Sequence, residues 1–239
     1  MVTLSKLRKG SSVSVRTMGQ SVNVDALSQL LKALRRPSLL VPQLRARRVE
    51  DLDFQKMHAA GIRYVVFDKD NTLTAPYVNE PPLKAKAAIA EAKRVFGERR
   101  CAVLSNSAGS ADDTDGKQAK AAEESLGLHV IRHAKKKPNC LDDLLQALSQ
   151  EKGKPDVHTV AIVGDRLLTD VFFANLFGMF AVHLRQPIAL KGDNPPALII
   201  RAIENFIFLP IVSSLAIAPP SHPLHDRMHH IMCQKHKAP

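Results

Sequence analysis

The sequence predicts an α/β protein in which helices flank a parallel, Rossmann-like sheet. Short apolar runs rich in β-branched residues alternate with helical segments between residues 51 and 184. This alternation is typical of a parallel sheet covered on both faces. Carboxylate, hydroxyl and ammonium side chains follow four of the apolar runs, at the sheet edge where open α/β proteins bind ligands.

Charge along the chain is very uneven. The 239 residues carry a net charge of +11, but residues 1–48 hold +9 of it and the other 191 residues hold only +2. Aromatic residues make up 5% of the chain and Trp is absent. A nearly neutral body with few aromatics disfavours a nucleic-acid-binding protein. We predict a basic N-terminal segment (1–48), one folded domain (49–205) and a C-terminal region (206–239).

The N-terminal segment contains two distinct parts. Residues 1–20 lack acidic residues and are rich in Lys, Arg, Ser, Thr and Val, which is typical of a mitochondrial or plastid transit peptide, with a disordered basic tail as the alternative. Residues 24–36 predict a helix with one apolar stripe, formed by Leu27, Leu30, Leu31 and Leu34. Its flanking cations suit contact with an anionic membrane surface, although packing on the domain explains the stripe equally well.

The elements of the folded domain follow one another in a regular order. Residues 51–60 predict a helix that ends at Gly61, a suitable C-terminal cap, and 62–67 predict a buried strand. The next helices are expected at 83–95, 118–126, 139–150 and 169–178. The strands between and after them are expected at 101–104, 129–131, 159–163 and 180–184.

The C-terminal region begins with an apolar stretch at 206–218. It is shorter than the about 20 residues that cross a bilayer, and Pro210 interrupts it, so we expect it to pack on the core. Beyond it we expect a polar, solvated tail rather than a metal site, although five histidines occur there: His222, His225, His229, His230 and His236. The three cysteines lack metal-ligand spacing and indicate a reducing compartment.

Four strand ends carry the residues that point to chemistry. Asp68 and Asp70 follow the first strand, and Ser105 and Asn106 follow the second. The third is followed by Lys135, Lys136 and Lys137, and the fourth by Gly164, Asp165 and, five residues later, Asp170. Oxygen ligands of this kind suit Mg²⁺ together with a phosphate.

This ordered set resembles the haloacid-dehalogenase-type phosphatases. The resemblance implies that Asp68 is a nucleophile that forms an aspartyl-phosphate and that Asp70 is the general acid and base. It also implies that Ser105, Asn106 and Lys137 bind the phosphate. Lys137, which precedes a proline, is preferred over Lys135 and Lys136. The Mg²⁺ ligands implied are Asp68, Asp70 (through its backbone carbonyl), Asp165 and Asp170.

The spacing of these motifs bears on the substrate. Only 37 residues separate Asp68 from Ser105, and 32 separate Ser105 from Lys137. One helix and one strand use up each interval, so no large cap domain is expected. An uncapped site can reach a phosphate displayed on a large structure.

Three stretches, 37–42, 61–74 and 164–171, are similar to the mitochondrial phosphatidylglycerophosphate phosphatases of fungi, algae and plants. This similarity implies hydrolysis of phosphatidylglycerophosphate, an anionic phospholipid, on the way to cardiolipin. It also implies peripheral contact with the matrix face of the mitochondrial inner membrane, with the plastid as the alternative. Two other hypotheses are a phosphatase of soluble phosphoesters and a catalytically inactive membrane-associated scaffold.

Overall fold

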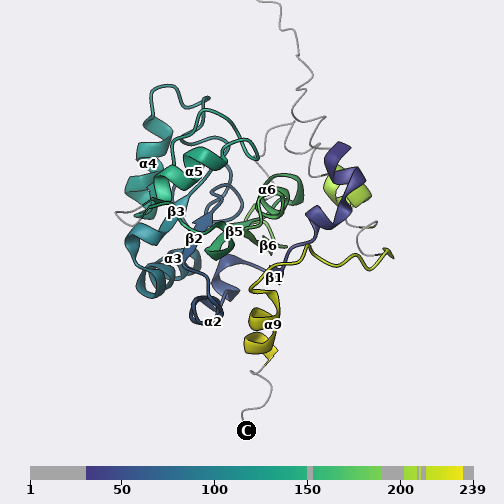
Figure 1. Ribbon diagram of the computed structural model, residues 1–239. Coiled ribbons are helices and arrows are strands. Elements are labelled where there is room, and N and C mark those ends of the chain that lie inside the picture. The colour runs from purple at the N-terminus through teal and green to yellow at the C-terminus, as the bar shows by residue number, and fades with distance from the viewer. Residues whose placement is uncertain (1–30, 150–152, 190–201, 209, 211–213, 234–239) are drawn as a thin grey trace, which may run out of the picture.

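Six strands form a single, wholly parallel sheet in the computed structural model, which confirms the predicted fold class (Figure 1). The structure describes residues 31–149, 153–189, 202–208, 210 and 214–233. The strand order is β1-β6-β5-β2-β3-β4. The bounds are β1 Leu44–Ala46, β2 Tyr64–Phe67, β3 Cys101–Val103, β4 His129–Val130, β5 Val160–Gly164 and β6 Phe180–Leu184.

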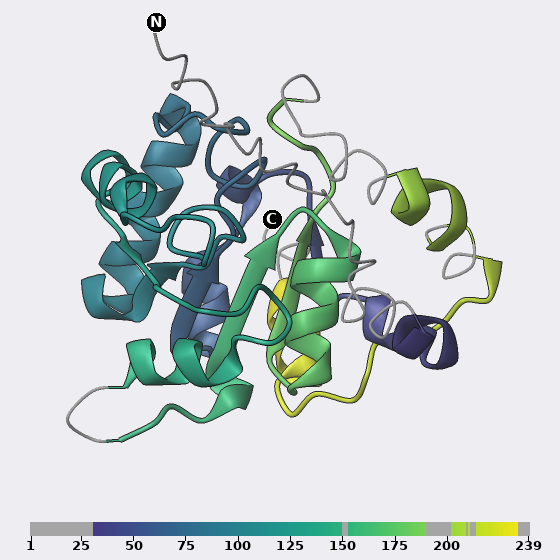
Figure 2. The same cartoon turned by 90° about the horizontal axis from the view of Figure 1, so that it is seen from above.

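Helices cover both faces of the sheet (Figure 2). They are α2 Phe54–Ala60, α3 Leu83–Phe96, α4 Lys117–Leu126, α5 Leu141–Leu148, α6 Phe172–Leu176 and α9 His225–Cys233. Tight 3-10 turns occupy Pro37–Leu40, Val49–Asp51, Glu98–Arg100 and Val157–Thr159, and wider π turns occupy Leu167–Val171 and Glu204–Phe208. No helix in the described part of the chain is long and apolar enough to cross a membrane.

Successive residues of the strands face opposite sides of the sheet and enter two separate apolar layers. In β2, Val65 and Phe67 pack with α2, α3, α4 and Met228 of α9, whereas Val66 packs with α5, α6 and Phe208. All three strand residues are fully buried. A strand buried on both faces explains the continuous apolar run in the sequence.

The chain reverses its direction of travel across the sheet between β2 and β5. From β2 it proceeds outward to β3 and β4, then returns to place β5 and β6 on the other side of β2. Such a switch point opens a crevice at the carboxyl ends of the two central strands. Asp68 follows β2 and Asp165 follows β5, so the topology places both carboxylates at this crevice. Only α3 and the 98–100 turn lie between β2 and β3 as regular elements.

The largest differences from the predicted helices lie at the starts of α2 and α6. The helix expected at 51–60 starts only at Phe54, because Asp53 caps it by accepting a hydrogen bond from Lys56 N (3.0 Å), and residues 49–51 form a 3-10 turn. Gly61 ends it as expected, with a φ of 120°. The helix expected at 169–178 begins with the π turn at Leu167, and α6 ends at Leu176.

Strand β1 was not predicted, because it is short and lies in the basic segment. It pairs with β6 at the sheet edge and is preceded by a connection fixed to α6. Asn175 of α6 donates to Leu39 O and Val41 O (both 2.9 Å), and Gln43 donates to Asn175 Oδ1 (2.8 Å). The end of the 1–48 segment is therefore part of the folded sheet.

The helix predicted at 24–36 is described only from residue 31, and the transit-peptide prediction for 1–20 lies outside the described residues. Residues 31–35 are helical and present a mixed surface. Ala33 is fully buried in the apolar layer of α5 and α6, whereas Leu31 and Leu34 are 44% and 51% exposed. The helix thus packs on the domain through Ala33 and leaves two of its leucines in solvent.

The expectation of a solvated C-terminal tail is wrong for part of that region. His222 is buried against the rings of His158 and Phe180. Helix α9 packs on α2, with Met228 only 2% exposed. The sequence does space Leu224, Met228, Ile231 and Met232 as one helical face, but the histidines among them favoured the interpretation as a polar tail.

Candidate active site

Asp68 begins a tightly folded loop at the end of β2. Its backbone N–H donates to Val163 O of β5 (2.8 Å), which continues the ladder one residue past the strand. The loop then closes through hydrogen bonds from Thr74 N to Lys69 O (3.1 Å) and from Asn71 N to Thr74 O (2.7 Å). Asn71 adopts a φ of 64°, a left-handed conformation that Asn tolerates. The loop fixes Asp68 at the central crevice.

Lys137 joins two of the predicted carboxylates. Its ammonium nitrogen lies 2.7 Å from Asp68 Oδ1 and 2.5 Å from Asp170 Oδ1, and the side chains of all three are at most 2% exposed. Its backbone N–H donates to Asn106 Oδ1 (2.9 Å), so the Asn106 amide holds the lysine loop. Lys136 instead pairs with Asp112 near the surface. Of the three consecutive lysines, the structure brings Lys137 to the aspartates.

Gly164 allows Asp170 to stand directly over the end of β5. A Cβ at position 164 would lie 2.2 Å from Asp170 Cγ, which is too close for two carbon atoms that are not bonded to each other. Asp170 would therefore have to move. The side chain of Asp170 also accepts a hydrogen bond from Arg166 N (3.2 Å). The glycine of the G-D-x-x-x-x-D pattern is therefore required for space rather than for an unusual backbone conformation.

Asp68, Asp165 and Asp170 form a buried carboxylate cluster with oxygens within 4.8 Å of one another. Burial raises the pKa of Asp68 to about 6, against the effect of the Lys137 ammonium and with the help of Asp170. Asp68 Oδ2 is buried and accepts no hydrogen bond from the described residues. Three carboxylates outnumber the nearby cations Lys137 and Arg166. The donor set fits a hard divalent cation such as Mg²⁺.

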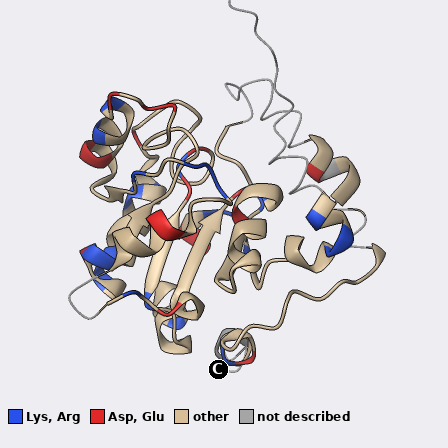
Figure 3. Cartoon of the chain, turned by 45° about the horizontal axis from the view of Figure 1, so that its top comes forward, with Lys and Arg blue, Asp and Glu red and all other residues tan. Residues whose placement is uncertain are grey.

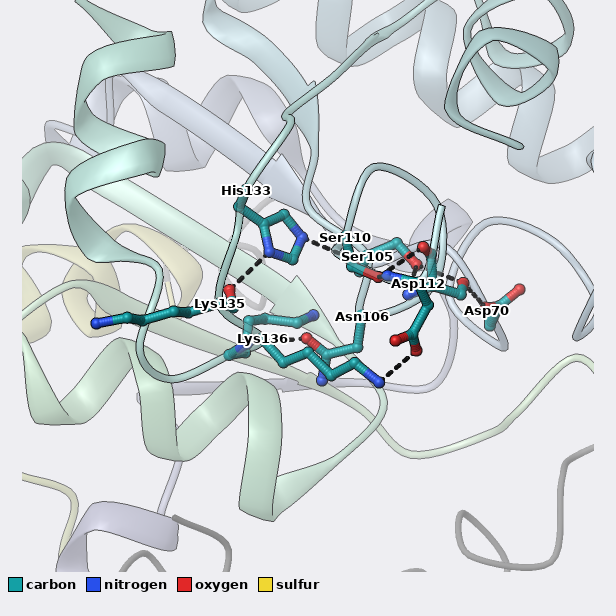
Figure 4. A network of polar contacts seen from close by, with 10 residues as sticks. Asp70, Ser105, Asn106, Ser110, Asp112, His133, Lys135 and Lys136 are labelled. Carbon is teal, nitrogen blue, oxygen red and sulfur yellow. Dashed lines mark hydrogen bonds and ion pairs between the residues drawn. The ribbon is translucent and has the colours of Figure 1, made fainter. Parts of the chain in front are cut away.

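Asp70 lies outside this carboxylate cluster. Its Oδ1 accepts hydrogen bonds from Lys69 Nζ (2.9 Å) and Tyr77 N (3.3 Å), and its Oδ2 accepts from Ser107 Oγ (2.9 Å). These contacts turn the side chain toward the loop that follows β3 (Figure 4). Asp70 therefore differs from the other aspartates, being partly open to solvent and oriented by three donors.

The loops after β3 and β4 are tied together beneath the site. Ser105 is 1% exposed, and its Oγ lies 2.9 Å from Ser107 Oγ. His133 places Nε2 2.8 Å from Ser105 O and Nδ1 2.7 Å from Lys135 O (Figure 4). The ring thus bridges the loop after β3, which contains Ser105, and the loop after β4, which contains Lys135.

Glu204 reaches the site from beyond the last strand. It is 3% exposed, and its Oε1 accepts a hydrogen bond from Leu168 N (2.7 Å), within the segment that joins Asp165 to Asp170. Burial raises the pKa of Glu204 to about 7, against the effects of this hydrogen bond and of Arg166. The nearby carboxylates, Asp68 first, raise the pKa of Arg166 although burial opposes this.

Sequence reasoning gave no role to four of these residues. Ser107 follows Ser105 by two positions, and His133 lies four before Lys137, so a wider view of both motifs would have included them. Arg166 stands inside the G-D-x-x-x-x-D pattern. Glu204 had no such signal, because only the folded chain brings it to Leu168.

The protein is a phosphatase, that is, a phosphoric monoester hydrolase. Its buried carboxylates and Lys137 lie at the switch point of the parallel sheet. A family model described as mitochondrial PGP phosphatase matches residues 24–189. The chain belongs to this family. The matched region contains every site residue named above except Glu204.

Relatives in algae, yeast and plants agree with this assignment. The chain is 38% identical over 196 residues to the chloroplastic phosphatidylglycerophosphate phosphatase 1 of Chlamydomonas reinhardtii, covering 80% of this chain and 70% of the relative. It is 32% identical over 188 residues to the mitochondrial phosphatidylglycerophosphatase of Saccharomyces cerevisiae, covering 78% and 99%. The Arabidopsis thaliana phosphatase, chloroplastic or mitochondrial by name, is 34% identical over 192 residues, covering 79% and 52%. No solved structure gives a significant match.

Proposed function

We propose that the protein hydrolyses phosphatidylglycerophosphate to phosphatidylglycerol and inorganic phosphate, a step toward cardiolipin. The observation that carries this proposal is the buried Asp68, held by Lys137 beside Asp165 and Asp170, in a chain of the phosphatidylglycerophosphate phosphatase family. The names of the relatives support the choice of substrate.

Asp68 is the proposed nucleophile. Lys137 engages its Oδ1, which leaves Oδ2 with lone pairs available. In the first step a carboxylate oxygen of Asp68 bonds to phosphorus, and the bond from phosphorus to the glycerol oxygen of the lipid breaks. Asp70 gives its proton to the departing oxygen, so phosphatidylglycerol leaves as a neutral alcohol at this position and an aspartyl-phosphate remains.

Water completes the reaction with the same residues. Asp70, now a carboxylate, takes a proton from a water molecule whose oxygen bonds to phosphorus. The phosphorus–oxygen bond to Asp68 breaks, which releases phosphate and restores the Asp68 carboxylate. Ser107, Lys69 and Tyr77 N orient Asp70 for both proton transfers. Reacting groups held in this way need little reorganisation.

The phosphate must be neutralised to approach three carboxylates. A Mg²⁺ ion held by Asp68, Asp165 and Asp170, and by the Asp70 carbonyl as the resemblance implies, would supply this neutralisation. Lys137 contributes a fixed positive charge, and the Ser105 hydroxyl is the proposed donor to a phosphoryl oxygen. Asn106 supports phosphate binding through the Lys137 loop that it holds.

The proposed location is the matrix face of the mitochondrial inner membrane, where the protein would be bound peripherally. The printed names of the relatives include both mitochondrial and chloroplastic proteins, so the plastid is the alternative. The basic residues of 1–48 support both import and attraction to anionic lipid.

The test is phosphate release by the purified protein from phosphatidylglycerophosphate in vesicles, with Mg²⁺ and with Mg²⁺ removed by a chelator. We expect turnover that is lost on chelation and restored by added Mg²⁺. A panel of soluble phosphoesters runs beside it. Rapid turnover of a soluble ester with no turnover of the lipid would overturn the proposed substrate. Undiminished turnover in the presence of the chelator would overturn the proposed dependence on Mg²⁺.

A further inference from the structure

The turn Glu204–Phe208 buries one large apolar side chain and exposes two others. Phe208 is 1% exposed and packs in the apolar layer of α5 and α6. Phe206 is 82% exposed and Ile207 is 47% exposed. Single exposed apolar residues are common, whereas Phe206 and Ile207 are adjacent to each other on an anchored turn. The expectation that residues 206–218 pack on the core holds for Phe208 and not for this pair.

This exposed pair is fastened to the active site. Glu204 begins the turn and accepts a hydrogen bond from Leu168 N, which lies between the metal-site residues Asp165 and Asp170. Two residues of chain span at most about 7 Å, so Phe206 stays within that backbone distance of Glu204. Whatever binds Phe206 and Ile207 is thereby held close to the catalytic loop.

Basic residues lie on the same side of the molecule as Phe206 and Ile207, the side beyond α6. The helical residues 31–35 lie beyond α6 on this flank in both Figure 1 and Figure 2, and Figure 3 marks its basic residues. Ala33 of this helix and Phe208 of the turn enter the same apolar layer. Lys32, Arg35 and the leucines Leu31 and Leu34 are exposed. Exposed apolar side chains flanked by cations match the interface of an anionic bilayer, which offers both acyl chains and negative headgroups.

We propose that Phe206 and Ile207 insert into the surface of an anionic bilayer while Lys32 and Arg35 contact its headgroups. This rests on the proposed function, which gives the enzyme a lipid substrate, and it names the surface that meets that lipid. Docking through this flank presents the carboxyl edge of the sheet, and so Asp68, to phosphate groups at the membrane surface.

The experiment measures binding of the full chain to vesicles by co-sedimentation, with no substrate present. The vesicles contain phosphatidylcholine with phosphatidylglycerol, and pure phosphatidylcholine vesicles are the comparison. The double variant Phe206→Ser, Ile207→Ser is compared with Leu83→Ser, which removes an 86% exposed leucine from α3. We expect the double variant to bind ~10-fold or more weakly, the factor that burial of one large apolar side chain corresponds to. Leu83→Ser binds as the wild type.

Equal binding by the double variant and the wild type would overturn the proposal. So would a wild-type dimer that the double variant dissociates without any change in vesicle binding, because the patch would then join two copies of this chain. Binding by the wild type that does not depend on phosphatidylglycerol would remove the role of Lys32 and Arg35. Turnover is measured separately, so failure to hydrolyse phosphatidylglycerophosphate would remove the proposed substrate while leaving the binding result to judge the surface.

Discussion

Lys137 pairs with two carboxylates in a buried site. Its ammonium group contacts both Asp68 and Asp170, and all three side chains are excluded from solvent. Removal of one member of such a buried set leaves the others uncompensated, which is far more costly than the loss of a surface pair. The lysine that contacts the proposed nucleophile therefore also holds together a buried charge cluster whose disruption is costly.

Gly164→Ala tests how closely Asp170 must approach β5. The new methyl group would overlap Asp170 Cγ, so the carboxylate must shift and its contact with Lys137 is disturbed. A displacement of about 1 Å at a catalytic centre can cost ~10²-fold in rate. We expect a loss of this order in the turnover of phosphatidylglycerophosphate, with circular dichroism like that of the wild type. Unchanged turnover would show that Asp170 has no fixed position in the reaction.

Ser107→Ala tests the orientation of Asp70. The substitution removes the hydroxyl that donates to Asp70 Oδ2 while Lys69 and Tyr77 N still hold Oδ1. We expect kcat to fall ~10-fold with little change in KM and an altered pH profile of kcat, because general acid–base help is worth ~10²–10⁴-fold in total. Ser110→Ala, which removes a hydroxyl bonded to Ser107 O on the same loop, is the matched control. Equal losses in both variants would indicate a loop defect rather than a role for Asp70.

At the level of the elements, the apolar runs predicted the five strands from β2 to β6 to within two residues at each end. They did so because buried parallel strands are apolar without interruption. Strand β1 escaped prediction, since its three residues include Arg45 and its stability comes from pairing with β6. The start of α2 was misplaced because Asp53 caps the helix, so that it begins at Phe54 rather than at residue 51. A long-range partner, β6, decided the first case, and a local cap decided the second.

The site, like the fold, was predicted from the sequence only in part. The order of the motifs and their positions after predicted strands identified Asp68, Asp165, Asp170 and Lys137, and the folded chain brings these residues together. Asp70 separates from the carboxylate cluster because its own loop turns it toward Ser107. Glu204 could not be predicted, because it reaches the site only through a contact with Leu168, 36 residues earlier.

Asp113→Ala tests an element-level contact at the start of α4. Asp113 accepts hydrogen bonds from Gly109 N, Gln118 N and Ala119 N, and so ties the helix start to the serine loop. We expect a loss of about 1–3 kcal/mol in the free energy of unfolding at neutral pH, measured by urea denaturation. Asp112→Ala, which removes only a surface pair with Lys136, should lose less.

The pH dependence of that loss has a definite sign. Burial acts to raise the pKa of Asp113, but the three backbone N–H groups outweigh it and hold the pKa below its usual value of 3.8. A lowered pKa in the folded state stabilises the protein fully above 3.8, and this contribution disappears as pH falls through the folded pKa. The difference between wild type and Asp113→Ala should therefore shrink in strong acid. A constant difference would show that the carboxylate charge has no part in it.

The molecule as a whole combines a neutral catalytic domain with cations near one flank. Its switch point lies between β2 and β5, and the connections around it add only single helices and short turns to the sheet among the described residues. The excess of positive charge in residues 1–48 and the exposed Phe206 and Ile207 suit a surface that meets anionic lipid. The proposed catalytic residues and the proposed lipid-contacting residues thus lie in different parts of the chain.

Substitution Asp68→Asn tests the central claim most directly, because it replaces one carboxylate oxygen by an amide group and leaves the shape of the side chain almost unchanged. The measurement is phosphate release from phosphatidylglycerophosphate vesicles by the purified variant in the presence of Mg²⁺, beside the wild type. With the fold verified by circular dichroism, we expect no release above the background without enzyme. Release at a rate comparable to that of the wild type would contradict Asp68 as the nucleophile and, with it, the proposed mechanism.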